Sequence, residues 1–191
     1  MTSPISPLKL VTPSAEYLPG YVDALERGWS PDNLRGAAAA TEQLTAIATD
    51  APRFLDSLYD PQAKGAPIKL ADGGTVPRLP GYFLWLWDGE FCGSISFRWS
   101  PGTSTLPSHV LGHIGYGVVP WKAGRGYATR ALGLLLPRCR AEGLDYVELT
   151  VQPDNLASQR VITANGGRFV ERFQKVDAHG GQESLRFRIE L

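Results

Sequence analysis

Two glycines and an arginine, Gly124-Arg125-Gly126, separate a short apolar segment from one that contains leucine and alanine. Residues 114–119 are β-branched, aromatic or glycine and end before a proline, which is typical of a strand that stops there. Residues 127–136 carry Ala and Leu at helical spacing. A glycine loop that opens a helix exposes unpaired backbone N–H groups at the positive end of the helix dipole. The pattern therefore predicts a site for a phosphate or pyrophosphate group.

Two well-known phosphate-binding loops do not fit this segment. A P-loop has Lys-Ser or Lys-Thr after its glycines, and neither pair follows Gly126. A dinucleotide-binding G-x-G-x-x-G loop needs a third glycine, and Thr129 stands in its place. The loop by itself leaves an ordinary glycine turn before a surface helix as an equal alternative.

The segment resembles motif A of the GNAT superfamily of acyl-CoA-dependent N-acyltransferases. In that motif a strand and a proline precede Q/R-x-x-G-x-G/A, which leads into a helix. Gly126 and Ala128 match the motif's glycine and its final alanine. Ala123 replaces the leading Gln or Arg, with Lys122 beside it, so one side-chain contact is lost and the backbone cradle remains.

A second segment is similar to motif B of the same superfamily, N-x-x-A/S-x-x-L/V-Y-x-x-x-G-F. Asn155 and Ser158 match its first two defined positions. Ile162 stands where many members have tyrosine, and Gly167 where they have phenylalanine. A helix N-cap is the alternative role for Asn155. The resemblance covers roughly residues 80–175, and two motifs at this separation are more specific than either one alone.

The resemblance implies an α/β (α+β) architecture, the GNAT fold. Its mixed, mostly antiparallel sheet has about seven strands, is flanked by about four helices and is splayed between the fourth and fifth strands. The residue pattern predicts strands at 8–11, 82–87, 91–99, 114–119, 144–151, 168–175 and 185–191. Helices are expected at 21–29, 37–58, 127–142 and 155–165, with Pro52 interrupting the second and Pro137 kinking or shortening the third. We expect a long loop at 60–80 with a small hairpin at Gly73-Gly74, and a turn around His179-Gly180-Gly181 between the closing strands.

Composition narrows the class of protein. The chain has 191 residues, 43% apolar and 20% charged, without an evident linker, so residues 1–191 are interpreted as a single GNAT-type domain. The formal net charge of zero gives no general attraction to nucleic acid or to an anionic membrane. Cys92 and Cys139 predict neither a disulfide framework nor a metal site, and they indicate a reducing compartment. We see no apolar leader and no segment of membrane length, so a cytoplasmic location is expected.

The resemblance implies acetyl-CoA as cosubstrate, no metal, and direct transfer of the acetyl group to an amine. Pyrophosphate would lie on the loop, and the pantetheine arm would add a pseudo-strand along the preceding strand. The residues expected to bind acetyl-CoA are Val118, Val119, Gly124, Arg125, Gly126, Tyr127, Ala128, Thr129, Asn155 and Ser158. A backbone N–H near Val118 would hold the thioester oxygen as it gains negative charge.

His113 and Tyr116 are the candidate catalytic residues. Many superfamily members have Glu-Ile-Gly-Tyr on this strand, and this chain has His113 in place of the glutamate. Histidine is a credible general base, because its reference pKa is ~6.5, and a half-buried histidine bonded to the backbone is an equal alternative. Tyr116 and Tyr127 are candidates to replace the tyrosine that is missing at Ile162, although Tyr116 alternates with core positions.

The acceptor is expected to be a small-molecule or peptide amine, and a homodimer remains open. Trp29, at the end of the first predicted helix, is a candidate for the acceptor site. Arg98 is either a ligand for an acceptor carboxylate or an exposed strand arginine. An alternative function is a non-catalytic acyl-CoA-binding domain that senses or scaffolds.

Overall fold

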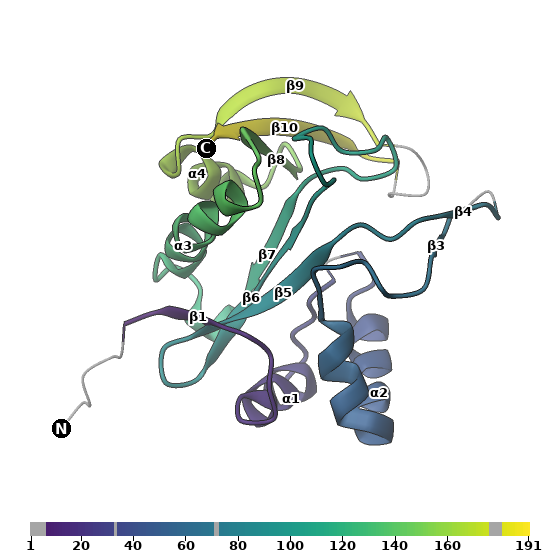
Figure 1. The fold of residues 1–191 in the computed structure, drawn as a ribbon. Helices are drawn as coiled ribbons and strands as arrows, with labels where there is room; N and C mark the ends of the chain where they lie inside the picture. Colours follow the sequence, from purple (N-terminus) through teal and green to yellow (C-terminus); the bar gives the residue numbers. More distant parts are fainter. Residues whose placement is uncertain (1–6, 33, 71–72, 176–180) are drawn as a thin grey trace.

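The computed structural model describes residues 7–32, 34–70, 73–175 and 181–191 (Figure 1). Its helices are α1 (Leu18–Glu26), α2 (Ala37–Ser57), α3 (Tyr127–Ala141) and α4 (Leu156–Ala164), with a 3₁₀ turn, η1, at Pro120–Lys122. The seven longer strands are β1 (Lys9–Val11), β5 (Gly81–Trp87), β6 (Phe91–Arg98), β7 (Ile114–Val118), β8 (Tyr146–Val151), β9 (Arg168–Gln174) and β10 (Glu183–Glu190). Three two-residue strands lie between α2 and β5: β2 (Tyr59–Asp60), β3 (Ile68–Lys69) and β4 (Thr75–Val76).

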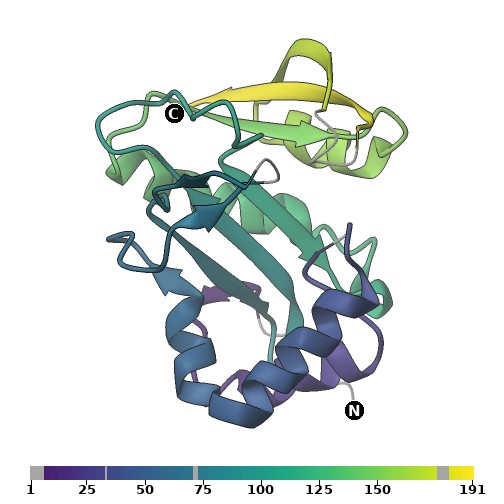
Figure 2. The ribbon, with the colours of Figure 1, turned by 90° about the vertical axis from the view of Figure 1, so that its right-hand side faces the viewer.

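The strands form two main sheets. The first has the order β1-β5-β6-β7, with β2 beside β5, and the second has the order β8-β10-β9. All the strand pairs in these sheets are antiparallel. Helices α1 and α2 lie on one face of the first sheet, α3 lies on its other face, and α4 lies beside α3 next to the second sheet (Figures 1 and 2). This arrangement confirms the predicted α/β fold.

The predicted splay lies between β7 and β8, the fourth and fifth of the longer strands. They belong to different sheets and diverge in Figure 1. The sheets approach each other at His113, whose backbone N–H donates to the Glu148 carbonyl at 2.8 Å. After this junction, the edge of β7 that faces away from β6 pairs with none of the described strands.

Two hydrophobic clusters hold these layers together. One lies between the first sheet and α3 and extends under the second sheet, with Leu84, Leu132 and Leu149 at its centre. The other joins α1 and α2 to the opposite face of the first sheet, where Tyr21 stacks on Trp85 with ring centroids 4.6 Å apart. Burying apolar surface on both faces fixes β5 and β6 as rigid supports for β7.

Prolines and glycines set several element ends. α1 begins at Leu18, earlier than predicted, because a proline is tolerated in the first turn of a helix. Pro52 follows a break in α2 at Asp50, whose φ of −158° is not helical and whose side chain accepts the Arg53 N–H, so the predicted interruption is confirmed. Pro137 lies inside α3, and the helix runs on to Ala141, so it does not shorten the helix.

The small hairpin predicted near Gly73-Gly74 is present as the pair β3 and β4. The turn predicted around His179-Gly180-Gly181 lies mostly outside the described residues. None of the helices in the described part of the chain combines the length and the apolarity that a bilayer crossing requires.

Candidate cofactor and acceptor site

The loop between β7 and α3 has the backbone geometry of an anion cradle. Gly124 and Gly126 have φ of +76° and +73°, which other residues rarely adopt. A Cβ built on either glycine meets no atom within 4 Å, so the face of the loop is open. Gly126 precedes α3 without a side-chain cap, which leaves the first N–H groups of the helix to an anion.

The first turn of α3 is held by its neighbours. The Tyr127 ring is buried in the core, and its hydroxyl donates to Asp88 Oδ2 at 2.5 Å. The Thr129 carbonyl accepts the Asn165 Nδ2 amide of α4 at 3.1 Å. Tyr127 therefore faces the core with its side chain, and its backbone N–H belongs to the cradle with those of Ala128 and Thr129.

A buried ion pair fixes the other end of the loop. Lys122 Nζ lies 2.7 Å from Asp88 Oδ1, and both side chains are only 7% exposed. Burial alone would raise the pKa of Asp88, but hydrogen bonds from Lys122 and Tyr127 lower it to about 2. Asp88, in the β5–β6 turn, thus bonds Lys122 before the glycines and Tyr127 after them. We call Asp88, Lys122 and Tyr127 the loop clamp.

The register of β7 shows which backbone groups face the splay. Val119 donates its N–H to the Cys92 carbonyl at 2.9 Å, and Arg98 donates to the His113 carbonyl at 2.9 Å. Because peptide groups alternate along an antiparallel strand, the N–H groups of Tyr116 and Val118 point away from β6. Val119 is fully buried and its N–H is taken by the sheet, so Val118 is the valine that presents its backbone to the splay.

Tyr116, Ser158 and Asn155 come together across the splay. The Tyr116 hydroxyl lies 2.7 Å from Ser158 Oγ, which connects β7 to α4. Asn155 caps α4, because its Oδ1 accepts the Ser158 N–H at 3.0 Å. Burial raises the pKa of Tyr116, so its hydroxyl keeps its proton at neutral pH. Hydrogen bonds therefore connect three residues that were predicted from two separate segments of the sequence.

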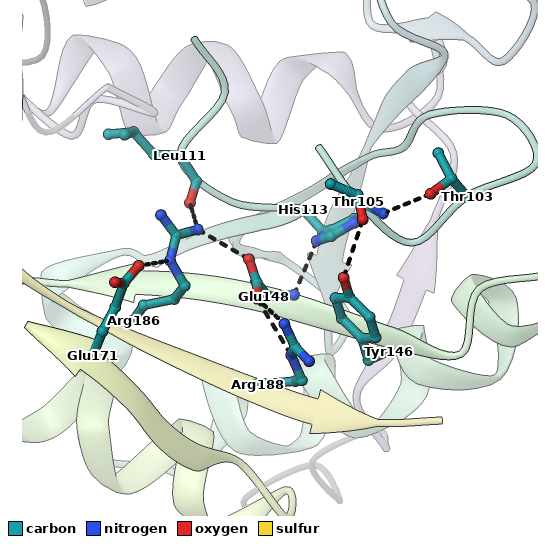
Figure 3. Close-up of polar contacts among 9 residues, drawn as sticks. All are labelled: Thr103, Thr105, Leu111, His113, Tyr146, Glu148, Glu171, Arg186 and Arg188. Atoms are coloured by element: carbon teal, nitrogen blue, oxygen red, sulfur yellow. Dashed lines mark hydrogen bonds and ion pairs between the residues drawn. The ribbon is translucent and has the colours of Figure 1, made fainter. Parts of the chain in front are cut away.

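His113 lies at the junction of the sheets (Figure 3). Its side chain is fully buried, and its Nδ1 accepts the backbone N–H of Glu148 at 2.9 Å. Nε2 is also buried and makes no hydrogen bond of normal geometry with the described residues. Burial lowers the pKa of His113 to about 4, although the Glu148 charge and the Ser104 backbone offset part of that shift. The ring is therefore neutral at pH 7, with its hydrogen on Nε2.

Glu148 is the centre of the polar cluster in Figure 3. Its carboxylate pairs with Arg186 at 2.9 Å and with Arg188 at 2.7 Å, both from β10. Arg186 also donates to the Leu111 carbonyl at 3.2 Å, which ties the segment before β7 to the second sheet. His113 is thus one of several contacts that hold this segment between the sheets. Whether it also acts as a base stays a prediction.

Other candidates occupy structural positions. Trp29 is buried against Tyr21 and Phe91, and a Cβ on Gly117 would lie 3.9 Å from its indole nitrogen, so it backs β7 from the α1 side. Ile162 is the buried residue of α4 and points into the core. A Cβ on Gly167 would lie 2.3 Å from the Ile162 side chain and 2.8 Å from its carbonyl, which explains glycine where relatives have phenylalanine.

A cavity of about 540 Å³ lies at the end of β7 away from the glycine loop. It is lined by the end of α2, the segment after β4, the ends of β5 and β6, and the segment before β7. Ile114, the first residue of β7, belongs to its wall. Within the described residues, no cluster of three or more His, Cys, Asp or Glu is arranged to hold a metal ion.

Sequence reasoning missed the loop clamp and Glu148. Asp88 had a sufficient local explanation in its Asp-Gly turn, and Lys122 stood beside the glycine loop like any surface lysine. Their pairing joins residues 34 positions apart, which no local pattern reveals. The one local signal for the clamp was Lys122, which stands beside the glycine loop at the point where Ala123 replaces the Gln or Arg of motif A.

The chain matches the model of the acetyltransferase (GNAT) family over residues 42–166, more than half of its length. The chain belongs to this family. Comparison with curated protein sequences gave no match.

Solved structures with the same fold include several acetyltransferases. Microcin C7 self-immunity acetyltransferase MccE, in complex with acetyl-CoA and AMP, has a TM-score of 0.63 at 13% identity, covering 99% of this chain and 98% of that one. RimL, a ribosomal L7/L12 alpha-N-protein acetyltransferase in complex with coenzyme A, has a TM-score of 0.63 at 14% identity, covering 98% and 97%. Mycobacterium smegmatis RimJ, in complex with CoA-disulfide, has a TM-score of 0.58 at 18% identity, covering 98% and 83%. At these identities the likeness establishes the fold.

Proposed function

We propose that this chain transfers an acetyl group from acetyl-CoA to the amine of a small-molecule or peptide acceptor. The observation that carries the proposal is the open, uncapped glycine loop at the start of α3, clamped on both sides. Family membership and the acetyl-CoA and CoA complexes of structures with this fold support the same cosubstrate.

The residues present fit coenzyme A along the splay. The cradle from Gly124 to Thr129 would hold the pyrophosphate, with Arg125 adding positive charge. The outward N–H of Val118 would bond the pantetheine arm as an added strand would. Asn155 and Ser158 would flank the arm from α4. When bound, acetyl-CoA supplies an activated thioester for direct attack by the amine.

Tyr116 is the proposed proton donor to the departing thiolate. Its hydroxyl lies in the splay, and its raised pKa keeps it protonated. His113 is a weak base as it lies here, because its pKa is lowered to about 4 and its Nδ1 already accepts the Glu148 N–H. We propose that the proton of the acceptor amine leaves through water, with His113 holding the sheet junction.

The buried His113 and the isoleucine at position 162 are also the observations that favour a second candidate function. A domain that binds acyl-CoA without catalysis needs neither a base nor the usual tyrosine. Measured turnover of acetyl-CoA with a panel of amines separates the two functions, because a sensor domain binds CoA and produces no acetylated amine.

Substitution of Gly126 tests the cofactor site. Gly126→Asp places a carboxylate on the open face of the loop, where it would repel the pyrophosphate. We expect CoA binding, measured by isothermal titration calorimetry, to weaken about 100-fold or more, since repulsion and loss of the cradle contacts together exceed about 3 kcal/mol.

Gly126→Asn is the matched control. Asparagine has the same shape as aspartate, tolerates positive φ better than most residues, and carries no charge. It should bind CoA at least 10-fold more tightly than Gly126→Asp. Equal affinity of both folded variants and the wild type would contradict a pyrophosphate site at this loop.

A further inference from the structure

Among the described residues, one charged side chain in the wall of the cavity at the start of β7 has no opposite charge beside it. Of the charged side chains in its wall, Asp60 accepts the N–H groups of Lys64 and Gly65, each at 2.8 Å, and lies beside Arg78. Arg78 donates to the Ala66 carbonyl at 3.2 Å. These two opposite charges therefore balance each other.

Arg98 is different. It is the last residue of β6, and its solvent-exposed side chain makes no ion pair or hydrogen bond with the described residues. Strand alternation points Arg98 away from the α3-side core that Phe97 enters, and Arg98 belongs to the wall of the cavity. A guanidinium keeps its charge at all relevant pH values and presents a planar fork of donors. Such a group in a cavity wall is suited to a carboxylate or a phosphate.

Arg98 stands at a defined position relative to the proposed cofactor. Its backbone N–H bonds the His113 carbonyl, so it lies level with the start of β7. The glycine loop lies beyond the other end of β7. A pantetheine arm that begins at that loop and follows the outward edge of β7 runs toward the cavity, because Val118 and Ile114 are ~13 Å apart along a strand. The reactive end of the cofactor and Arg98 would then meet the same acceptor.

We infer that the acceptor is an amine that also carries a carboxylate or phosphate group, and that Arg98 binds this group in the cavity. The inference rests on the proposed function for the identity of the amine. The binding of an anion by Arg98 can be tested whether or not the chain catalyses acetyl transfer. Arg98 would determine specificity, because acceptors without the anionic group would leave the guanidinium unpaired.

Direct binding is tested without turnover. The arginine Nε–H signals of the ¹⁵N-labelled full chain, with CoA present, are followed by NMR during titration with inorganic phosphate and, separately, with acetate. The signal missing from Arg98→Met identifies Arg98. We expect this signal to shift saturably with at least one anion, and the comparison shows whether phosphate or carboxylate is preferred. A linear, unsaturable shift equal to that of Arg140, an arginine of α3 outside the cavity, would overturn the inference.

Turnover provides the second test. Amines are supplied in pairs that differ in the anionic group: amino acids and dipeptides as free acids or as amides, and phosphoethanolamine with ethanolamine. Arg98→Met should lower kcat/KM for the anionic member roughly 10- to 100-fold and leave the neutral member within about twofold. Arg98→Lys should recover part of the loss, and Arg140→Met should change neither.

Equal losses for both members of each pair would overturn the inference, because Arg98 would then act on something other than the anion. Absence of turnover with every amine, in wild type that binds acetyl-CoA, would count against the transferase function. The NMR titration would in that case still decide whether Arg98 binds an anion.

Discussion

A neutral imidazole has one lone pair to offer, and in His113 that lone pair accepts the Glu148 N–H. To take a proton from an amine, the ring would have to release this bond and charge itself in a site where burial lowers its pKa to about 4. At the scale of the residue, the same geometry makes His113 a support for the junction of the sheets.

The His113 pKa predicts a stability change with pH. The unfolded histidine titrates near 6.5 and the folded one near 4, so between these values the unfolded chain binds more protons. The contribution of His113 to the free energy of unfolding is therefore fully present above pH 6.5. It decreases as the pH falls toward 4, by up to about 3 kcal/mol. Urea unfolding of wild type and His113→Asn over this range should show a shallower decline in the variant, whose amide oxygen can still accept the Glu148 N–H.

The variant His113→Asn also distinguishes a structural role of His113 from a role as general base. If His113 is structural, His113→Asn should acetylate an accepted amine within about twofold of the wild-type kcat at neutral pH. A fall of about 100-fold, with unchanged CoA affinity and stability, would instead identify His113 as the general base.

At the scale of elements, the loop clamp joins three segments that are separate in the sequence. The β5–β6 turn supplies Asp88, η1 supplies Lys122, and α3 supplies Tyr127. Because the clamp bonds both sides of residues 123–126, it limits how far the loop can open. A loop held in its bound shape loses less conformational entropy when it binds an anion.

Asp88→Asn tests the clamp. It leaves the Lys122 ammonium buried, and the one charged partner that remains to it among the described residues is the exposed Glu90, 3.1 Å away. We expect the free energy of unfolding to fall by about 3 kcal/mol, as when one member of a buried ion pair is removed. Chemical denaturation measures this loss, and CoA titration should show weaker binding, because the loop ends are released.

Lys122→Met, combined with Asp88→Asn, is the control. The double variant removes the unpaired ammonium and should be more stable than Asp88→Asn alone. Strictly additive losses would mean that the two residues do not stabilise the loop as a pair.

Sequence reasoning reached those elements whose pattern is local. The strand, glycine loop and helix from β7 to α3 were predictable, because Gly124, Gly126 and the alanines of α3 each constrain their own backbone. The N-cap at Asn155 was foreseen as an alternative for the same reason. The Asp88–Lys122 pair, and Glu148 as the residue whose backbone bonds His113, depend on how distant segments pack, and the sequence of one protein does not record that packing. The interpretation of residues 1–191 as one domain stays a prediction.

At the scale of the whole molecule, the proposed cofactor lies between two sheets and should stabilise parts of both. Hydrogen exchange with CoA at about 100 times its Kd should slow by up to about 100-fold in the glycine loop, along β7 and in the first turn of α4. The exposed strand β9 should change little and serves as the internal reference. Slowing confined to residues 123–130 would mean that the pantetheine arm does not follow β7.

β10 is the last strand in the sequence, yet it lies between β8 and β9. Its register pairs Leu185 with Val151 and Glu190 with Tyr146, so β8 gains its partner only when a segment more than thirty residues downstream folds back onto it. Contacts of this range form slowly compared with a hairpin such as β5–β6. Glu148, which holds His113 through its backbone, receives both of its arginine partners from the same late strand. We therefore expect the second sheet to form after the first. A chain with only its first sheet formed would have the glycine loop without the strands and helix that face β7 across the splay, where the proposed cofactor would lie.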